Sequence, residues 1–124
     1  MGLKPGGQST ITPWTTNTDN WATLANQTVK PFEAIRVALN ERLRAGAPMT
    51  TAHVATTAGA ADAIYVSQTG HPIRVIFDAA DKMESSRNSG KFRVDLGQPT
   101  ADGVHMSGPL HEVGATAINA LLLL

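Results

Sequence analysis

Between positions 20 and 45, large apolar side chains recur at spacings of three and four residues, the period of one face of an α-helix. They are Trp21, Leu24, Phe32, Ile35, Leu39 and Leu43, with Thr28 at the intermediate position between Leu24 and Phe32. Pro31 interrupts this stripe, and proline either bends a helix or stands in its first turn. The pattern therefore predicts one bent helix, or two short helices with a boundary near Thr28.

The end of this helical segment carries its own signals. Arg42 and Arg44 are expected in the last turn, where positive charge suits the negative end of the helix dipole. Gly46 can adopt the left-handed conformation that closes a helix, and Pro48 prevents continuation. We therefore place an amphipathic helical segment at residues 21–46. Its apolar face is expected to pack on the protein's own sheet or on a neighbouring subunit.

After Pro48 the apolar residues form short runs rich in Val, Ile and Thr, separated by turn residues. Such runs at spacings of about eight to twelve residues are typical of a β-sandwich or a small barrel. The predicted strands are 52–57, 63–67, 73–77, 92–96, 104–106, 110–113 and 118–123. Residues 78–84 predict a single helical turn or a loop.

Residues 1–20 are polar and rich in Gly and Pro, so they predict an extended arm. Trp14 is the exception, because a large aromatic side chain in such an arm is suited to docking on protein. We expect the arm to be ordered only against another chain or the protein's own surface. The predicted fold class is α+β in one globular domain, with an N-terminal extended arm (1–20), an amphipathic helical segment (21–46) and a mainly antiparallel β-sandwich or small β-barrel (49–124).

The last four residues of the sequence are leucines. They are too few to cross a bilayer, and an exposed run of this kind would promote aggregation. The run predicts a terminal β-strand over residues 117–124 that is buried on both faces. We expect Leu122 and Leu124 to contribute to the core or to a subunit interface.

Ten basic and ten acidic side chains give a formal net charge of zero at pH 7. A nucleic-acid-binding surface needs clustered basic groups, so this balance gives no reason to expect nucleic acid as a partner. A net charge near zero also removes the repulsion that keeps copies apart, which favours a homo-oligomer. No stretch has the pattern of a membrane span or a signal peptide, so we expect no membrane partner.

The densest group of reactive side chains is His105, Ser107 and His111. Serine catalysis needs a base within hydrogen-bonding distance and a third group that orients the base, and no nucleophile-elbow pattern surrounds Ser107. The histidine spacing does not match the tight spacings of zinc ligands. We therefore predict no catalytic residue, no metal ligand and no cofactor. The three carboxylates of Asp78, Asp81 and Glu84 are predicted to form a solvated, charged turn.

The helical segment resembles a known pattern. Trp21 and Leu24, followed by residues 32–46 with their central Leu39-Asn-Glu-Arg42, resemble tryptophan-led helices of small virion structural proteins of tailed bacteriophages. The Thr-, Ala- and Gly-rich part after it resembles the same class. This resemblance implies a structural role in a tail, fibre adaptor, neck or capsid decoration. It carries no catalytic residues to this chain.

Two classes of function follow. The first is a non-enzymatic assembly protein of a virion, present in the host cytoplasm during assembly, with other copies of itself and neighbouring virion proteins as partners. The alternative is a small ligand-binding or hydrolytic β-domain that uses the region from His105 through Ser107 to His111. For the first class the interface candidates are Trp14, Trp21, Phe32, Ile35, Leu39, Leu43, Leu122 and Leu124.

Overall fold

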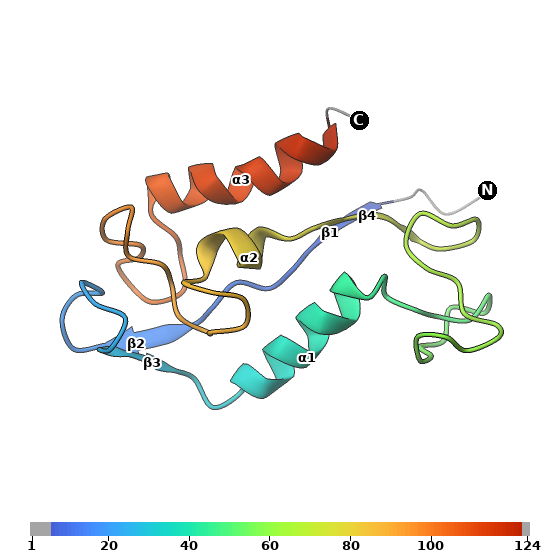
Figure 1. Ribbon diagram of the computed structural model, residues 1–124, viewed down its shortest axis with the longest axis horizontal. Coiled ribbons are helices and arrows are strands. Elements are labelled where there is room, and N and C mark those ends of the chain that lie inside the picture. The colour runs from blue at the N-terminus through green and yellow to red at the C-terminus, as the bar shows by residue number, and fades with distance from the viewer. Residues whose placement is uncertain (1–5, 123–124) are drawn as a thin grey trace.

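The computed structural model describes residues 6–122, with side chains through Ile118, and arranges them as a small α+β fold (Figure 1). Its regular elements are short, and long irregular loops join them. In chain order they are β1 (Gly6–Ser9), β2 (Thr15–Asn17), β3 (Gln27–Val29), α1 (Glu33–Arg44), β4 (Ile73–Phe77), α2 (Ala79–Met83) and α3 (Gly108–Leu122).

The strands form two separate pairs. β1 pairs with β4 in parallel, and β2 pairs with β3 antiparallel, with Thr16 opposite Thr28. The expected mainly antiparallel β-sandwich or small β-barrel is therefore wrong, because each sheet found within residues 6–122 has two strands. Residues 6–17, which were expected in an extended arm, supply one strand to each pair and are ordered against the protein's own surface.

Loops replace most of the predicted strands. The predicted strand 73–77 forms as β4. By contrast, His53 and Ser67 have φ values of 62° and 69°, a left-handed conformation that an extended strand does not contain. Phe92 and Met106 retain only isolated bridge contacts. The short apolar runs therefore belong mainly to irregular segments.

The C-terminal segment is helical rather than extended. α3 begins at Gly108 and continues to Leu122, so it replaces the predicted strands 110–113 and, as far as the described residues go, 118–123. Pro109 stands in the first turn, where its missing N–H costs no hydrogen bond. The Ala- and Leu-rich sequence that follows favours a helix. A short apolar run does not by itself distinguish a strand from a helix, and the strand prediction was wrong for that reason.

Residues 20–32 also differ from the prediction, since the helix begins only at Glu33. Asp19 accepts hydrogen bonds from the backbone N–H groups of Ala22 and Thr23, as a helix cap would. However, the positive φ of 57° at Trp21 turns the chain back, so that β3 can pair with β2. The apolar residues before Pro31 therefore belong to a hairpin and not to a first helix.

A small apolar core lies where α2 meets α3. It consists of Met83, Phe92 and Leu110, with Met106 and Val113 packed against it. Figure 1 shows α3 running along α2, with α1 at the opposite edge of the molecule. Gly114 permits this close approach, because a Cβ atom at that position would lie 2.0 Å from Cε of Met83.

The side chain of Gln27 joins β3 to this core. Its carbonyl oxygen accepts a hydrogen bond from the N–H of Phe92 at 2.9 Å, and its amide nitrogen donates to the carbonyl oxygen of Phe92 at 2.8 Å. On the neighbouring strand, Thr15 accepts a hydrogen bond from the indole N–H of Trp21 at 2.8 Å. The two bonds of Gln27 attach the β2–β3 hairpin to the α2–α3 core, and the bond between Thr15 and Trp21 closes the hairpin on itself.

Replacing Phe92 with alanine tests the placement of the core. Phe92 is 0 % exposed, so Phe92→Ala is expected to lower the free energy of unfolding by about 3–5 kcal/mol. Urea titration followed by far-UV circular dichroism measures this change. Phe32→Ala, made at a half-exposed phenylalanine, is the matched control and should cost much less. Equal losses in the two variants would contradict this core.

Candidate protein interface

The outward face of α1 is apolar. Phe32, just before the helix, is 42 % exposed, Ile35 is 72 % exposed and Leu39 is 40 % exposed. Ala34 and Ala38 are exposed beside them. Contiguous apolar surface of this kind on a protein commonly marks a binding site.

An aromatic pair extends this face at the start of the helix. The rings of Trp14 and Phe32 lie 5.0 Å apart between centroids and are tilted by 54°, a geometry that aromatic rings prefer. Nζ of Lys30 lies 5.5 Å from the centre of the Trp14 ring, within range of a cation–π interaction. We call Trp14, Phe32, Ile35 and Leu39, together with Ala34 and Ala38, the α1 patch.

The α1 patch faces outward because the buried side of the helix is polar. Asn40 is fully buried, and it bonds both backbone groups of Ile11. Its side-chain oxygen accepts from the N–H of Ile11 at 2.7 Å, and its nitrogen donates to the Ile11 carbonyl at 2.8 Å. Arg36 donates to the same carbonyl at 2.8 Å. The segment between β1 and β2 is therefore held along one side of α1, and the apolar side remains uncovered.

Arg36 also forms a buried ion-pair network. It contacts Glu33 one turn earlier and Glu84 at the end of α2. The prediction of a solvated turn is therefore wrong at Glu84, whose side chain is buried. Glu84 accepts a further hydrogen bond from the N–H of Asn88 at 2.6 Å. Burial raises the pKa of Glu84, and the attraction of Arg36 opposes that rise only in part. This network links the middle of α1 to the α2–α3 part of the fold.

A second polar cluster fixes the C-terminal end of α1. Arg44 donates two hydrogen bonds to Asp78, at 2.8 Å and 3.0 Å, and further bonds to Glu41 and Asn88. Burial alone would raise the pKa of Asp78, but hydrogen bonds from Arg44 and Thr10 outweigh this effect and lower it. The middle of the helix is thus attached to the end of α2, and its C-terminal end is attached to the residue after β4 and to the loop after α2.

The interface candidates from the sequence fall into three groups. Trp14, Phe32, Ile35 and Leu39 lie at the surface, whereas Trp21 and Leu43 are buried within the fold. Leu122 is the last described residue of α3, and Leu124 lies outside the described residues. The sequence analysis missed Arg36 and Asn40, which set the orientation of α1. Their position on the helix face next to the apolar stripe was the available signal.

The region of the alternative function does not form a triad. Nδ1 of His105 lies 2.6 Å from Oδ2 of Asp102, and this contact, with backbone N–H groups of the same turn, lowers the pKa of Asp102. Ser107 lines the same shallow pocket. Among the described residues, however, the Ser107 hydroxyl makes no hydrogen bond to His105 or His111. The geometry is that of an exposed turn before α3.

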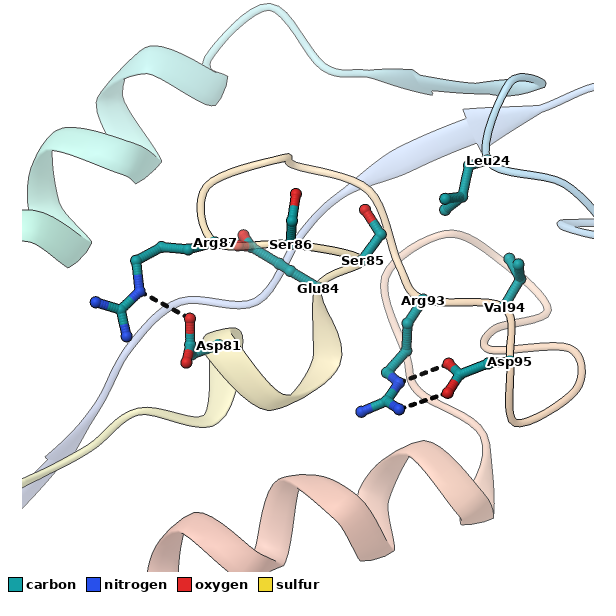
Figure 2. A pocket seen from close by; sticks show the side chains of 9 residues that line it. All are labelled: Leu24, Asp81, Glu84, Ser85, Ser86, Arg87, Arg93, Val94 and Asp95. Carbon is teal, nitrogen blue, oxygen red and sulfur yellow. Dashed lines mark hydrogen bonds and ion pairs between the residues drawn. The ribbon is translucent and has the colours of Figure 1, made fainter.

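One surface groove is lined mainly by charged side chains, four of which form two ion pairs. It has a volume of about 540 Å³ and is bounded by Leu24 and Val94 at one end. Figure 2 shows Arg87 directed at Asp81 and Arg93 at Asp95. Because each guanidinium already has a carboxylate partner, the groove presents balanced charge rather than a strong anion site.

Neither a metal-binding cluster nor a membrane-crossing helix is found in the part of the chain that the structure describes. Within it, no group of three or more His, Cys, Asp or Glu side chains is placed to hold a metal ion. None of its helices has both the length and the apolar character that crossing a membrane requires.

Neighbouring residues on α1 provide a matched pair of tests. Asn40→Ala removes two hydrogen bonds and leaves both backbone groups of Ile11 without that partner, so it should lower the free energy of unfolding by about 2–4 kcal/mol. Leu39→Ala, made at a half-exposed position, should cost less than about 1 kcal/mol. Urea denaturation measures both changes. A larger loss in Leu39→Ala would show that the helix is turned the other way.

The Asp78–Arg44 pair predicts a dependence of stability on pH. Because the folded state lowers the pKa of Asp78 from 3.8, its contribution is present above that value and is lost as the pH falls through the folded pKa. Asp78→Asn should therefore destabilise the protein near neutral pH and make little difference near pH 2. Thermal unfolding of both proteins across this range measures the gap. A gap that stays constant with pH would rule out the ion pair as its source.

Comparison of the chain with protein-family models, with curated proteins and with solved structures finds no match. The function must therefore be inferred from the geometry of the chain itself. The resemblance of residues 21–46 to phage virion helices remains a prediction. What the geometry offers is an apolar surface on a helix whose other side is fixed by buried polar bonds.

Proposed function

We propose that this chain is a non-enzymatic assembly protein, a structural component of a bacteriophage virion, and that it binds neighbouring protein subunits through the α1 patch. The observation that carries the proposal is the exposure of Ile35, Leu39 and Phe32 on one face of a well-anchored helix. The resemblance of the helical segment to virion proteins is the reason for assigning this assembly role to a virion. The partners are other copies of the chain and adjoining virion proteins.

The anchoring of α1 supports this proposal. An exposed apolar face on a loosely held helix could turn inward, but Arg36 and Asn40 bond the opposite face to the fold. Turning the helix would carry Arg36 and Asn40 out to water. It would leave the buried carboxylate of Glu84 and the backbone groups of Ile11 without these partners, which costs several kcal/mol. The α1 patch therefore stays at the surface of the monomer and becomes buried only when another protein binds it. Each large side chain that becomes fully buried there contributes about 1.5–3 kcal/mol.

The arrangement around His105 gives less support to a hydrolytic function. A nucleophilic serine needs a base positioned to take its proton. His105 is directed to Asp102 in an exposed turn, and the described contacts leave Ser107 outside this pair. The shallow pocket beside it has a volume of about 260 Å³. An assembly role agrees better with the surface of this protein.

Ile35→Glu tests the proposed function. Ile35 is mostly exposed, so the variant should keep its circular dichroism spectrum and its melting temperature within about 2–4 °C. A charge in the centre of the patch should nevertheless exclude the chain from assembled particles and lower the yield of infectious particles at least tenfold. Mass spectrometry of purified particles and plaque counts measure these effects.

The matched control is Val54→Glu, which introduces the same charge at an exposed apolar residue outside α1. It should leave incorporation and particle yield unchanged. Absence of the wild-type chain from purified particles would refute the virion role. Normal incorporation of Ile35→Glu would refute the role of the α1 patch.

A further inference from the structure

We infer that the first partner of the α1 patch is a second copy of this chain, with the two α1 helices packed antiparallel about a two-fold axis. This inference rests on the proposed function and names the partner at the same surface. Three observations carry it: the arrangement of large and small residues on the helix, the charges at its two ends, and the size of the face.

Large and small side chains alternate along the exposed face of α1. Ile35 and Leu39 project from it, whereas Ala34 and Ala38 are exposed and short. With 3.6 residues per turn, Ile35 and Ala38 are neighbours on the helix surface. The face therefore carries projections and depressions side by side.

An antiparallel pair fits these projections into the depressions. In a two-fold interface, residue i contacts j of the second copy and j contacts i. With the axis between positions 36 and 37, Ile35 meets the second copy's Ala38, and Leu39 meets its Ala34. Large side chains then fill the space over small ones, which is how helices pack closely. A parallel pair would instead set Ile35 against Ile35 and leave the alanines facing each other across a gap.

The charges at the helix ends favour the same orientation. Lys30 precedes the helix beside Trp14. Near the C-terminal end, Glu41 bonds Arg44 and Asn88 through Oε1, and its side chain is still 52 % exposed. In the antiparallel register, Lys30, which precedes one helix, is placed near the C-terminal end of the second copy's helix, where Glu41 lies. Symmetry creates this attraction twice, and it specifies orientation more than affinity. A parallel pair would bring like charges together.

The size of the face predicts a weak pair. α1 has 12 residues, so it is about 18 Å long, and with a width of about 10 Å its face covers roughly 200 Å². Trp14 and Phe32 widen the contact, yet it stays below the approximately 800 Å² per partner of a standard stable interface. The zero net charge does not oppose association. We therefore expect a dimer in exchange with the monomer at micromolar concentrations, as suits a subunit that gains its remaining contacts in a larger assembly.

Sedimentation velocity of the full chain over a concentration series tests the pairing. The weight-average mass should rise from that of a monomer toward that of a dimer. Ile35→Glu should weaken dimerisation at least tenfold, whereas Val54→Glu should leave it unchanged. A monomer at all concentrations, or a dimer indifferent to Ile35→Glu, would overturn the inference.

Cross-linking tests the orientation, since the chain contains no cysteine. The double variant Ala34→Cys/Leu39→Cys should be joined into dimers by a short bismaleimide, because these positions face each other in the antiparallel pair. Ala45→Cys alone should remain uncross-linked, because the two copies of this residue lie at opposite ends. Efficient dimerisation of Ala45→Cys would indicate a parallel pair and overturn the antiparallel arrangement.

The two proposals fail in distinguishable ways. If the chain is monomeric but Ile35→Glu still lowers particle yield, the proposed function stands with a different partner and self-pairing is wrong. If the chain dimerises through α1 but is absent from particles, self-pairing stands and the proposed virion role is wrong.

Discussion

Two buried side-chain amides join segments that the short sheets of this protein do not reach. Asn40 bonds both the N–H and the carbonyl of Ile11, and Gln27 does the same for Phe92. Each amide thus acts as a one-residue substitute for a neighbouring strand, since it offers one donor and one acceptor. Buried backbone groups must find such partners. In a fold with two-stranded sheets, side chains supply what further strands would otherwise provide.

The bonds between Asn40 and the backbone of Ile11 determine which side of α1 stays exposed. The side of α1 that carries Arg36 and Asn40 must face the protein, because its polar atoms are bonded there to Ile11 and Glu84. An ion pair that is buried adds little net stability, but separating its members is strongly unfavourable. The apolar side consequently has no place in the monomer. The buried polar bonds of Arg36 and Asn40 and the exposure of the apolar side of α1 therefore have the same cause.

The sequence predicted some elements well and others poorly, for physical reasons. The helix up to Arg44 was predictable because its apolar spacing, basic last turn and Gly46 all agree. The direction of its apolar face was not, because that depends on Asn40 finding Ile11, a contact that no local pattern reveals. The strand 73–77 was predictable from its β-branched run. The C-terminal helix was misread because its short apolar runs fit a strand as well as a helix. Gly114, which lies within this helix, makes room for Met83.

The candidate site was predictable in part. Trp14, Phe32, Ile35 and Leu39 were identified as interface candidates from their spacing, and they lie at the surface. The same spacing also selected Trp21, which the structure buries beside Thr15. Apolar periodicity shows which residues share a face, but it cannot tell whether the protein or a partner covers that face. The deciding information lies in the polar residues of the opposite face.

The parallel pairing of β1 with β4 has a consequence for synthesis on the ribosome. β1 is near the start of the chain, yet Gly6 pairs with Ile73, and a contact between residues so far apart in sequence forms slowly because a long loop must close. β1 therefore waits for its partner until the chain as far as β4 has emerged. During that interval the segment around Ile11, which depends on β1 for its position, has not yet reached α1. Nascent chains would expose both sides of this helix and would be prone to associate with other chains before synthesis is complete. The finished fold covers only one of these two sides.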